Sequence, residues 1–447
     1  MIVILVAGSI YAVVFLPYDQ IGQDYEQKRL EGRSYMPRIA APAWFNWFSI
    51  TPRLSRLILD ENTDGYAVST RLLDNGWIEK TTTFTFDYFY QESPSEVYMY
   101  FDSNYVEKPP YVSLEWIYPD GRTLELRGMA APTGSGYDFE QGMNVNQLLK
   151  QYPDWKEWFV PSGSLAMDPT QLLFVTSNAT TPVPQHGQYQ LKVTTLLFET
   201  GSTLQPELVL LGQVYGIAGT DFARRDLMVT LFWGMPFALL VGLLGSLLTT
   251  LVAMLLPAIG VWYGGWVDNA IQRLTEINMV LPSLMIAVLV NVLFNLNIWV
   301  TLGIVVVINA LGSPVKTLRS ALLQAKEAPY IETARSYGAS DFRIITRYLV
   351  PRVLPVLIPQ LVSQVPSFIF WEATLGLFNI KSVYPSWGRI IYESLEQGAL
   401  YGSPYWVLEP ISLLLITSLA FAMLGSSLER ILNPRMLESV SVVASRE

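Results

Sequence analysis

Two long stretches without a charged residue are the strongest constraint on how this chain folds. No Asp, Glu, Lys or Arg stands between Asp226 and Asp268, a stretch of 41 residues, and none stands in Ile277–Val315, a stretch of 39. A helix needs about 20 apolar residues to cross a membrane. Each stretch is about twice that length, and the chain is therefore predicted to be a polytopic membrane protein.

The first of six predicted spans is residues 2–16, an uncharged run that would be about 22 Å long as a helix. A secretory signal peptide is the alternative interpretation. It is disfavoured because a basic segment before the run is missing and Pro17-Tyr18-Asp19 is a poor cleavage site. We therefore interpret this run as an uncleaved span.

Prolines and turn residues divide the remaining apolar sequence. A helical start lying on the membrane surface is predicted to break at Pro236, and three prolines are predicted to interrupt the fifth span. The other five spans are predicted at 237–257, at two places in 277–315 on either side of a turn near Asn295–Asn297, at 353–371 (interrupted by Pro355, Pro359 and Pro366) and at 410–428.

The loop at 316–352 carries seven basic and three acidic residues. An excess of Lys and Arg is typical of cytoplasmic loops. With six spans this places both termini in the cytoplasm and residues 18–226 outside it.

Residues 18–218 have a different character, and we predict that they form a mainly antiparallel β-domain, a sandwich, with helical pieces near 54–60 and 146–159. A sequon at Asn178-Ala179-Thr180 is consistent with an external location. Strand-like segments rich in aromatic and β-branched residues are separated by turn residues. They are TTTFTFDYFY, EVYMYFD, YVSLEWIY, TLELRGMA, QYQLKVTTLLFE and ELVLLGQVYG.

Composition excludes several classes of function. The net charge of −9 belongs wholly to residues 17–225, with 25 acids against 16 bases, so nothing favours nucleic-acid binding. The chain has no cysteine and one histidine, His186, which excludes disulfides and a multi-histidine metal site. No lysine follows a glycine, so there is no phosphate-binding P-loop. Any ATP hydrolysis must belong to another subunit.

Residues 329–351 are predicted to form a helix, a turn and a second helix. Pro329 suits the first helical turn. Gly338 stands where the residue after a helix adopts a positive φ. Ser340 suits the N-cap of the second helix. This basic hairpin between apolar runs provides a surface on the cytoplasmic side.

The hairpin resembles the "EAA" signature of binding-protein-dependent ABC importer permeases, through the spacing Glu332-x-Ala334-x3-Gly338-x12-Pro351. A surface hairpin could share this spacing by chance, but further motifs follow in the order of that family. Three positions depart from the usual pattern, with alanine, isoleucine and leucine replaced by Thr333, Tyr348 and Val350.

Four further elements resemble the dipeptide, oligopeptide and nickel branch of this family, in its second or "C-type" permease subunit. Residues 219–226 resemble its GTD-x3-RD element, with Arg224 in place of the usual glycine. Residues 263–268 are YGGWVD, residues 385–388 are PSWG, and the ending LGSSLERILNPRM resembles the family's terminus. Tyr18 and Asp19 fit the family's exit from the first span. The basic tail that the family carries before it is missing, which suggests a truncated or short start.

The resemblance implies an α-helical polytopic membrane protein with six spans, in the type I ABC importer permease fold, carrying an inserted mainly-β extracytoplasmic domain. The expected partners are a second permease subunit in a heterodimer, two ATPase subunits and an extracytoplasmic solute-binding protein. The chain itself is expected to hold no cofactor, with ATP and Mg on the ATPase subunits. The expected parts are 1–17 as the first span, 18–218 as the insertion, 219–436 as the permease core with coupling loop 316–352, and 437–447 as a cytoplasmic tail.

Three sets of site residues follow, with no catalytic or metal site among them. Coupling to the ATPase is assigned by the resemblance to Tyr330, Glu332, Ala334, Arg335, Gly338, Ala339 and Ser340. The family-motif positions are Gly219, Thr220, Asp221, Arg225, Asp226, Gly265, Trp266, Asp268, Pro385, Ser386, Trp387 and Gly388. Polar residues inside spans usually face protein or a water-filled path, and these pathway candidates are Asn291, Asn309, Gln360, Ser363, Gln364, Ser367 and Glu372.

The predicted function is that of a permease subunit forming half of a translocation pathway for peptides or similar small solutes. The alternative is a membrane-anchored receptor or solute-binding protein whose β-domain is the active part. A membrane enzyme is disfavoured, because no motif pairs a nucleophile with a base. The substrate stays open among peptides, oligosaccharides and nickel, and the scarcity of histidine argues against nickel contacts in this chain.

Overall fold

The computed structural model describes residues 1–17, 19–21, 23, 32–143, 150, 169–175, 184–380 and 385–432. The chain divides into two compact units. One is Asp19–Met228, and the other joins Met1–Tyr18 to Val229–Glu447. The predicted helix at 146–159, the sequon at 178–180 and the tail at 437–447 lie outside the described residues.

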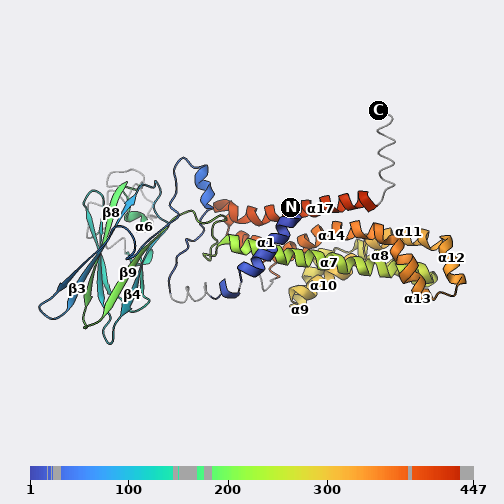
Figure 1. Cartoon of the computed structure of the whole chain (residues 1–447), viewed down its shortest axis with the longest axis horizontal. Helices are drawn as coiled ribbons and strands as arrows, with labels where there is room; N and C mark the ends of the chain where they lie inside the picture. Colours follow the sequence, from blue (N-terminus) through green and yellow to red (C-terminus); the bar gives the residue numbers. More distant parts are fainter. Residues whose placement is uncertain are drawn as a thin grey trace, which may run out of the picture. The chain divides into compact units, whose positions relative to one another are not determined.

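The described part of the Asp19–Met228 unit contains nine strands in two antiparallel sheets (Figure 1). The strands are β1 Arg56–Leu59, β2 Tyr66–Leu72, β3 Ile78–Tyr88, β4 Glu96–Asn104, β5 Tyr111–Ile117, β6 Thr123–Ala130, β7 Gly136–Asp138, β8 Gly187–Leu197 and β9 Thr203–Leu211. The four-stranded sheet has the order β1-β9-β4-β7, and the five-stranded sheet has the order β2-β3-β8-β5-β6. Short helices α3 (Phe139–Gly142) and α6 (Pro169–Leu172) and a 3-10 helix, η1 (Ala43–Trp47), complete the described part of this unit.

Alternation of buried and exposed residues explains the strands. In β3 and β8, Phe84 is paired with Leu191 and Phe86 with Tyr189, and all four side chains are buried in one core. Trp116 of β5 is fully buried in that core, and its Nε1 donates to Leu173 O at 2.8 Å. The six segments predicted as strands are confirmed within β3, β4, β5, β6, β8 and β9.

The helix predicted near 54–60 is wrong, because this segment contains β1. Arg56 is paired with Leu211 and Leu59 with Leu208, so β1 satisfies its backbone groups on the edge of β9. Four residues of mixed apolar spacing do not distinguish a helix from a strand, and hydrogen bonding to a neighbouring strand decides between them.

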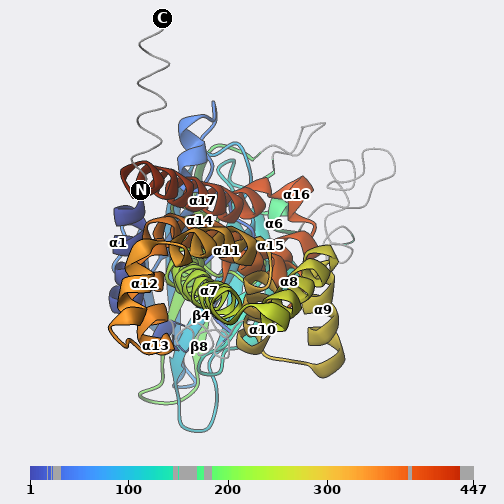
Figure 2. The same cartoon turned by 90° about the vertical axis from the view of Figure 1, so that its right-hand side faces the viewer.

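The second unit is helical, and Figures 1 and 2 show α14 lying between α17 and α7. Glycines allow close approach: a Cβ on Gly245 of α7 would lie 2.3 Å from Phe368 of α14. The helices are α1 Ile2–Phe15, α7 Leu227–Tyr263, α8 Gly265–Val280, α9 Ser283–Phe294, α10 Ile298–Ala310, α11 Ser313–Lys326, α12 Pro329–Ser336, α13 Asp341–Ile344, α14 Val350–Leu377, α15 Trp387–Glu396, α16 Ala399–Gly402 and α17 Pro404–Leu432, with a π-helical turn η3 at Ile345–Leu349.

Among the described residues, three helices are long and apolar enough to cross a membrane: α7, the helix that runs over Asp341–Leu377, and α17. The number rises to five if each of two bent pairs is one span. α8 and α9 are bent by 84° and α10 and α11 by 45°. α1 is apolar but has only 14 residues. Helices of this length and apolar composition are typical of a membrane protein.

The predicted breaks at prolines are wrong. Pro236 lies inside α7, which is 37 residues long, and Pro355, Pro359 and Pro366 lie inside α14. Proline removes one helical hydrogen bond and strains the preceding turn. In an apolar environment, leaving the helix would expose more backbone polar groups than the proline does, so the helix continues.

The predicted turn at Asn295–Asn297 is confirmed. Asn295 has φ of 47°, and Asn297 is the N-cap of α10, with its side chain accepting from Val300 N at 2.9 Å. The apolar helices on either side have only 12 and 13 residues. Each is shorter than the span predicted there, because the chain bends again at Pro282 and Gly312.

Candidate functional site

The predicted hairpin is present, and its turn follows from Gly338. α12 begins with Pro329 in its first turn, as predicted. Gly338 has φ of 77°, its N–H donates to Arg335 O at 2.9 Å, and Ala339 N–H donates to Ala334 O at 3.1 Å. These two bonds form a Schellman motif, which ends a helix by satisfying its last carbonyl groups.

Ser340 is the N-cap of α13 by position, but its hydroxyl makes no capping hydrogen bond. Its carbonyl instead accepts from Ile344 N–H at 2.9 Å. The chain then passes through the π-helical turn η3 directly into α14. A continuous helix thus connects the hairpin to a predicted span.

One face of the hairpin is buried and the other is exposed. Ile331, Ala334 and Ile344 pack into a core with residues of α7, α11 and α14. The exposed face carries Tyr337 and Phe342, and Glu332, Arg335 and Tyr330 are also exposed. Both aromatic side chains are therefore available for contact with a partner.

Basic residues brace the hairpin against the C-terminal end of α7. Lys326 Nζ donates to Val261 O at 2.6 Å and to Trp262 O at 3.3 Å, where a helix leaves its carbonyl groups unpaired. The Arg335 guanidinium lies 5.1 Å from the centre of the Trp262 ring. Arg335 therefore contacts the C-terminal end of α7, against which the hairpin packs.

The YGGWVD motif makes the turn from α7 to α8. Gly264 and Gly265 both have positive φ, and Trp266 is exposed. Asp268, in the first turn of α8, accepts two parallel hydrogen bonds from Arg319 of α11, at 2.9 Å to Oδ1 and 2.5 Å to Oδ2. This motif ties together the helices that support the hairpin.

The PSWG motif closes the other end of α14. Ser386 caps α15 by accepting from Arg389 N at 3.2 Å. Trp387 is buried, its Nε1 donates to Leu231 O of α7 at 3.0 Å, and a Cβ on Gly388 would lie 2.3 Å from Ala373 O. Pro385 is buried at the start of the motif. The motif packs α14, α15 and α7 at backbone contact.

Glu372 lies in α14 beside Ser386 and is fully buried. Neither of its carboxyl oxygens meets hydrogen-bond geometry with any residue that the structure describes. It is not among the residues that line the cavity containing Asn309, Gln364 and Ser367. The structure places it in the packing of the PSWG junction.

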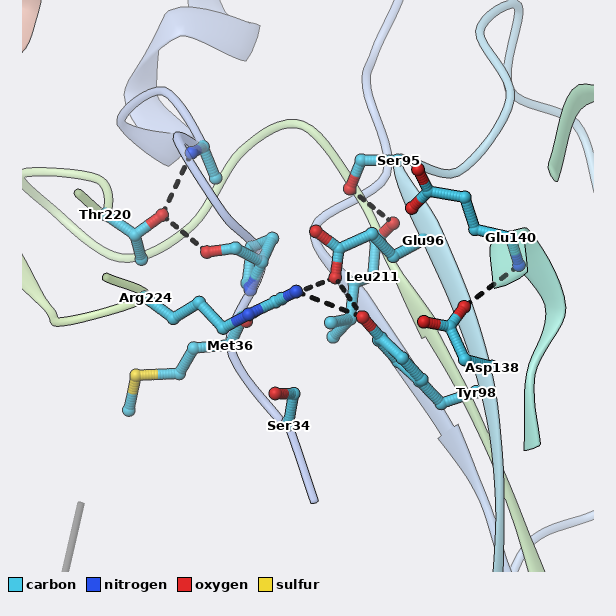
Figure 3. Close-up of polar contacts among 12 residues, drawn as sticks. Ser34, Met36, Ser95, Glu96, Tyr98, Asp138, Glu140, Leu211, Thr220 and Arg224 are labelled. Atoms are coloured by element: carbon cyan, nitrogen blue, oxygen red, sulfur yellow. Dashed lines mark hydrogen bonds and ion pairs between the residues drawn. The ribbon is translucent and has the colours of Figure 1, made fainter. Parts of the chain in front are cut away.

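The 219–226 element lies in the β unit (Figure 3). Thr220 Oγ1 donates to Pro37 O at 2.7 Å, and Arg225 Nε donates to Asp221 Oδ2 at 2.6 Å. Asp226 accepts from Met228 N at 2.8 Å at the start of α7, and Gly219 has positive φ.

Arg224 takes the position where the family usually has glycine, and it has φ of 63°. Its guanidinium pairs with Glu96, donates to Tyr98 Oη at 3.0 Å and to Met36 O at 3.1 Å (Figure 3). Burial lowers the pKa of Arg224, but the hydrogen bond and charge of Glu96 outweigh burial and raise it. Burial, together with Glu96, raises the pKa of Tyr98.

A cavity of about 330 Å³ lies in the helical unit, at the two bends of the chain. Its lining includes three of the predicted pathway candidates, Asn309, Gln364 and Ser367, and the Oε1 of Gln364 is buried without a hydrogen-bond donor among the described residues. All the lining residues are uncharged. The cavity's polar lining is Asn278, Ser283, Asn309, Ser313, Gln364 and Ser367.

Sequence reasoning missed Asn278, Ser283 and Ser313. The available signal was their position near two prolines, with Asn278 and Ser283 within four residues of Pro282 and Ser313 next to Pro314. Chain breaks inside a membrane are tolerated where they line a cavity.

The remaining pathway candidates do not line this cavity. Asn291 donates to Leu296 O and to Thr301 Oγ1, both at 2.8 Å, and so closes the turn between α9 and α10. Ser363 packs against Gly425 of α17. Gln360 has a buried Oε1 without a donor in the described part of the chain.

Comparison with known proteins agrees with this arrangement. Residues 245–438 match the family of the binding-protein-dependent transport system inner membrane component. The dipeptide transport system permease protein DppC of Bacillus subtilis is 28% identical over 220 residues, which are 49% of this chain and 68% of that protein. The oligopeptide transport system permease protein OppC of Escherichia coli is 29% identical over 219 residues, 48% of this chain and 72% of that protein.

Among solved structures, a chain of the inward-facing MetNI methionine ABC transporter is similar at 18% identity and a TM-score of 0.37, covering 46% of this chain and 98% of that one. The family match and the permease relatives cover the part of the chain that holds the hairpin, the YGGWVD and PSWG motifs and the cavity. These relatives are named as transport permeases. The matched part of the chain, residues 245–438, is similar to the inner membrane component of binding-protein-dependent transport systems and to the dipeptide and oligopeptide permeases.

Proposed function

We propose that this chain is one of two permease subunits of a type I ABC importer with six spans, and that it forms half of the pathway for peptides or similar small solutes. The relatives named for dipeptide and oligopeptide transport support this substrate class. The observation that carries the proposal is the hairpin α12–α13, which is ordered by its own turn, backed by a core and aromatic on its exposed face.

The hairpin is proposed to dock on an ATPase subunit in the cytoplasm. ATP and Mg would be held there, since this chain carries no P-loop. Tyr337 and Phe342 would fill a groove on the partner, and Glu332 would meet it with a carboxylate. Because η3 and α14 continue from the hairpin, a shift of the hairpin would be passed to the predicted fifth span.

The cavity is proposed to be part of the pathway. Its volume is at the lower end of small-molecule sites, which are about 300–1,000 Å³. Amide and hydroxyl groups can hydrogen-bond a peptide backbone without binding it as tightly as a buried charge would. Asn309, Gln364 and Ser367 would contact the solute as it passes.

The basic excess of the hairpin loop supports a cytoplasmic hairpin and cytoplasmic termini, with the β unit outside. An extracytoplasmic solute-binding protein would deliver the solute, and a second permease would complete the pathway in a heterodimer.

Affinity purification of the full chain from its native membrane tests this proposal. We expect an ATPase and a second permease to copurify in stoichiometric amounts, and reconstituted vesicles to hydrolyse ATP faster when the binding protein is loaded. A chain that purifies without an ATPase, yet binds solute through its β unit, would instead be a membrane-anchored receptor.

A further inference from the structure

The β unit exposes a short apolar segment, the 44–50 loop WFNWFSI, which consists of most of the 3-10 helix η1 and the turn that follows it. Trp47 is 84% exposed, Phe48 is 81% exposed, and Ile50 is fully exposed. Contiguous large apolar side chains in water are rare unless something covers them.

This 44–50 loop is held in place and is not collapsed onto the sheet. Asn46 Nδ2 donates to Arg53 O at 3.0 Å, and Arg53 N–H donates to Asn46 Oδ1 at 3.0 Å, which closes the loop at its base. Trp44 Nε1 donates to Ile217 O at 2.9 Å. The apolar tip therefore points outward on a fixed base.

Hydrogen bonds inside the same unit tie this base to the first residue of α7. Leu227 N–H donates to Gly219 O at 3.1 Å. Gly219 is two residues from Ile217, at most about 7 Å along an extended chain. The loop thus lies close to the point where the uncharged run of α7 begins.

The first helix also ends in an exposed apolar side chain. Phe15, at the end of α1, is exposed. The carbonyl of the next residue, Leu16, accepts from Trp233 Nε1 at 2.7 Å. Trp233 is six residues beyond Leu227, about 9 Å along a helix. Within the helical unit, Trp233 of α7 is thus bonded to the residue that follows the exposed end of α1.

Local charge suits a membrane surface. Residues 32–59 contain four arginines and no acidic residue, although residues 17–225 as a whole carry a net charge of −9. Two of these arginines pair with acidic residues from elsewhere in the unit, Arg33 with Asp102 and Arg53 with Glu92. Arg38 is exposed and lies 4.8 Å from the centre of the Phe222 ring, which is also exposed. Trp, Phe and Arg are the residues that gather at the boundary between acyl chains and headgroups.

We propose that the 44–50 loop inserts Trp47, Phe48 and Ile50 into the interfacial layer of the lipid bilayer and anchors the β unit to the membrane surface. This inference rests on α7 being a span, which follows from the family and from its length, and it does not depend on the transported solute.

The chain has no cysteine, so single-cysteine labelling tests the proposal in the full-length protein. Phe48→Cys is labelled with an environment-sensitive fluorophore and reconstituted alone into phosphatidylcholine–phosphatidylglycerol vesicles. Lipids carrying a spin label near the headgroup and aqueous iodide serve as two quenchers. Val106→Cys is the matched control, since Val106 is equally exposed but lies after β4 at residue 104.

We expect a blue-shifted Phe48 label that the spin-labelled lipid quenches and iodide does not, and a Val106 label with the opposite response. Iodide quenching of both labels, without lipid quenching, would overturn the proposal. A Phe48 label that becomes shielded only after a partner subunit or binding protein is added would also overturn it, because a protein would then be the occupant.

Discussion

Arg319 of α11 binds the carboxylate of Asp268 of α8 through two parallel hydrogen bonds, 51 residues apart in sequence. The pair joins α8, whose first turn completes the YGGWVD motif, to α11, the helix before the hairpin. Both side chains are partly buried, and fork-shaped guanidinium–carboxylate pairs are the stronger kind.

We therefore expect Asp268→Asn to lower the free energy of unfolding by about 1–3 kcal/mol, the cost of leaving a charged partner with poorer hydrogen bonds. Thermal unfolding in detergent measures it. The double variant Asp268→Asn/Arg319→Gln should lose little more than the single one, because the two residues act as a pair. Additive losses would show that they act independently.

Gly338→Val tests the hairpin turn. A Cβ there would meet no atom within 4 Å, so the only cost is the positive φ, about 1–2 kcal/mol. Relieving that strain re-aims the second half of the hairpin. We expect normal membrane insertion, little transport, and ATPase activity that no longer responds to solute.

Gly398→Val is the matched control for that variant, since Gly398 also has positive φ and open space but lies before α16. It should carry the same strain and keep coupled transport. Coupled transport in Gly338→Val would show that the hairpin only spaces two helices.

Local chemistry explains why the hairpin was predictable and the cavity was not. Pro329 and Gly338 act through their own backbone preferences, which need no neighbour. The cavity forms where distant residues such as Asn278 and Gln364 meet after two bends, and the bend angles come from packing. Whether Gln364 serves the solute stays a prediction.

In the β unit, too, some strands could be predicted from their own residues and one could not. β3 alternates from Thr82 onward and β8 from Tyr189 onward, and these residues were predicted as strands. β2 is exposed at nearly every position, so it carries no alternation, and it is a strand because it pairs with β3 along seven residues. Breaks were predicted in α7 and α14 because proline removes a helical hydrogen bond. The helices continue because a break would expose more backbone polar groups to the apolar surroundings.

Gly388→Ala tests the packing of the PSWG motif. The added methyl group would lie 2.3 Å from Ala373 O, a backbone atom that cannot move aside cheaply. Overpacking of this kind costs about 1–3 kcal/mol. We expect a lower melting temperature in detergent. Gly402→Ala, where nothing lies within 4 Å, should melt like the unmodified protein. Equal melting of both variants would contradict the close contact.

Glu199 gives the β unit a pH dependence. Its carboxylate accepts from Val106 N at 2.8 Å, from Lys108 N at 2.5 Å and from Glu107 N at 2.9 Å, and these bonds lower its pKa from 4.5. Because the pKa of Glu199 is lower in the folded protein than in the unfolded protein, its full stabilisation is present at pH values above the unfolded-state pKa. The stabilisation is lost as the pH falls through the folded-state pKa.

We expect Glu199→Gln to melt at a lower temperature than the unmodified protein at pH 7, with a difference that shrinks as the pH falls below 4.5. Calorimetry of the full-length protein measures both. Glu125→Gln, at an exposed position of β6, is the control. A difference that grows on acidification would reverse the sign and refute the assignment.

Arg224 weighs backbone strain against a buried ion pair. Its positive φ costs about 1–2 kcal/mol, which glycine would recover. Losing the guanidinium leaves the Glu96 carboxylate nearly buried without its charged partner, and breaking such a pair costs about 3–5 kcal/mol.

We therefore expect Arg224→Gly to destabilise the β unit by about 1–4 kcal/mol, the difference between the two ranges. Arg224→Ala should be less stable again, because it keeps the strain and loses the same contacts. Thermal unfolding of the three proteins gives the order. If Arg224→Gly proved more stable than the unmodified chain, the contacts with Glu96, Tyr98 and Met36 would be worth less than the strain, and the arginine would need another explanation.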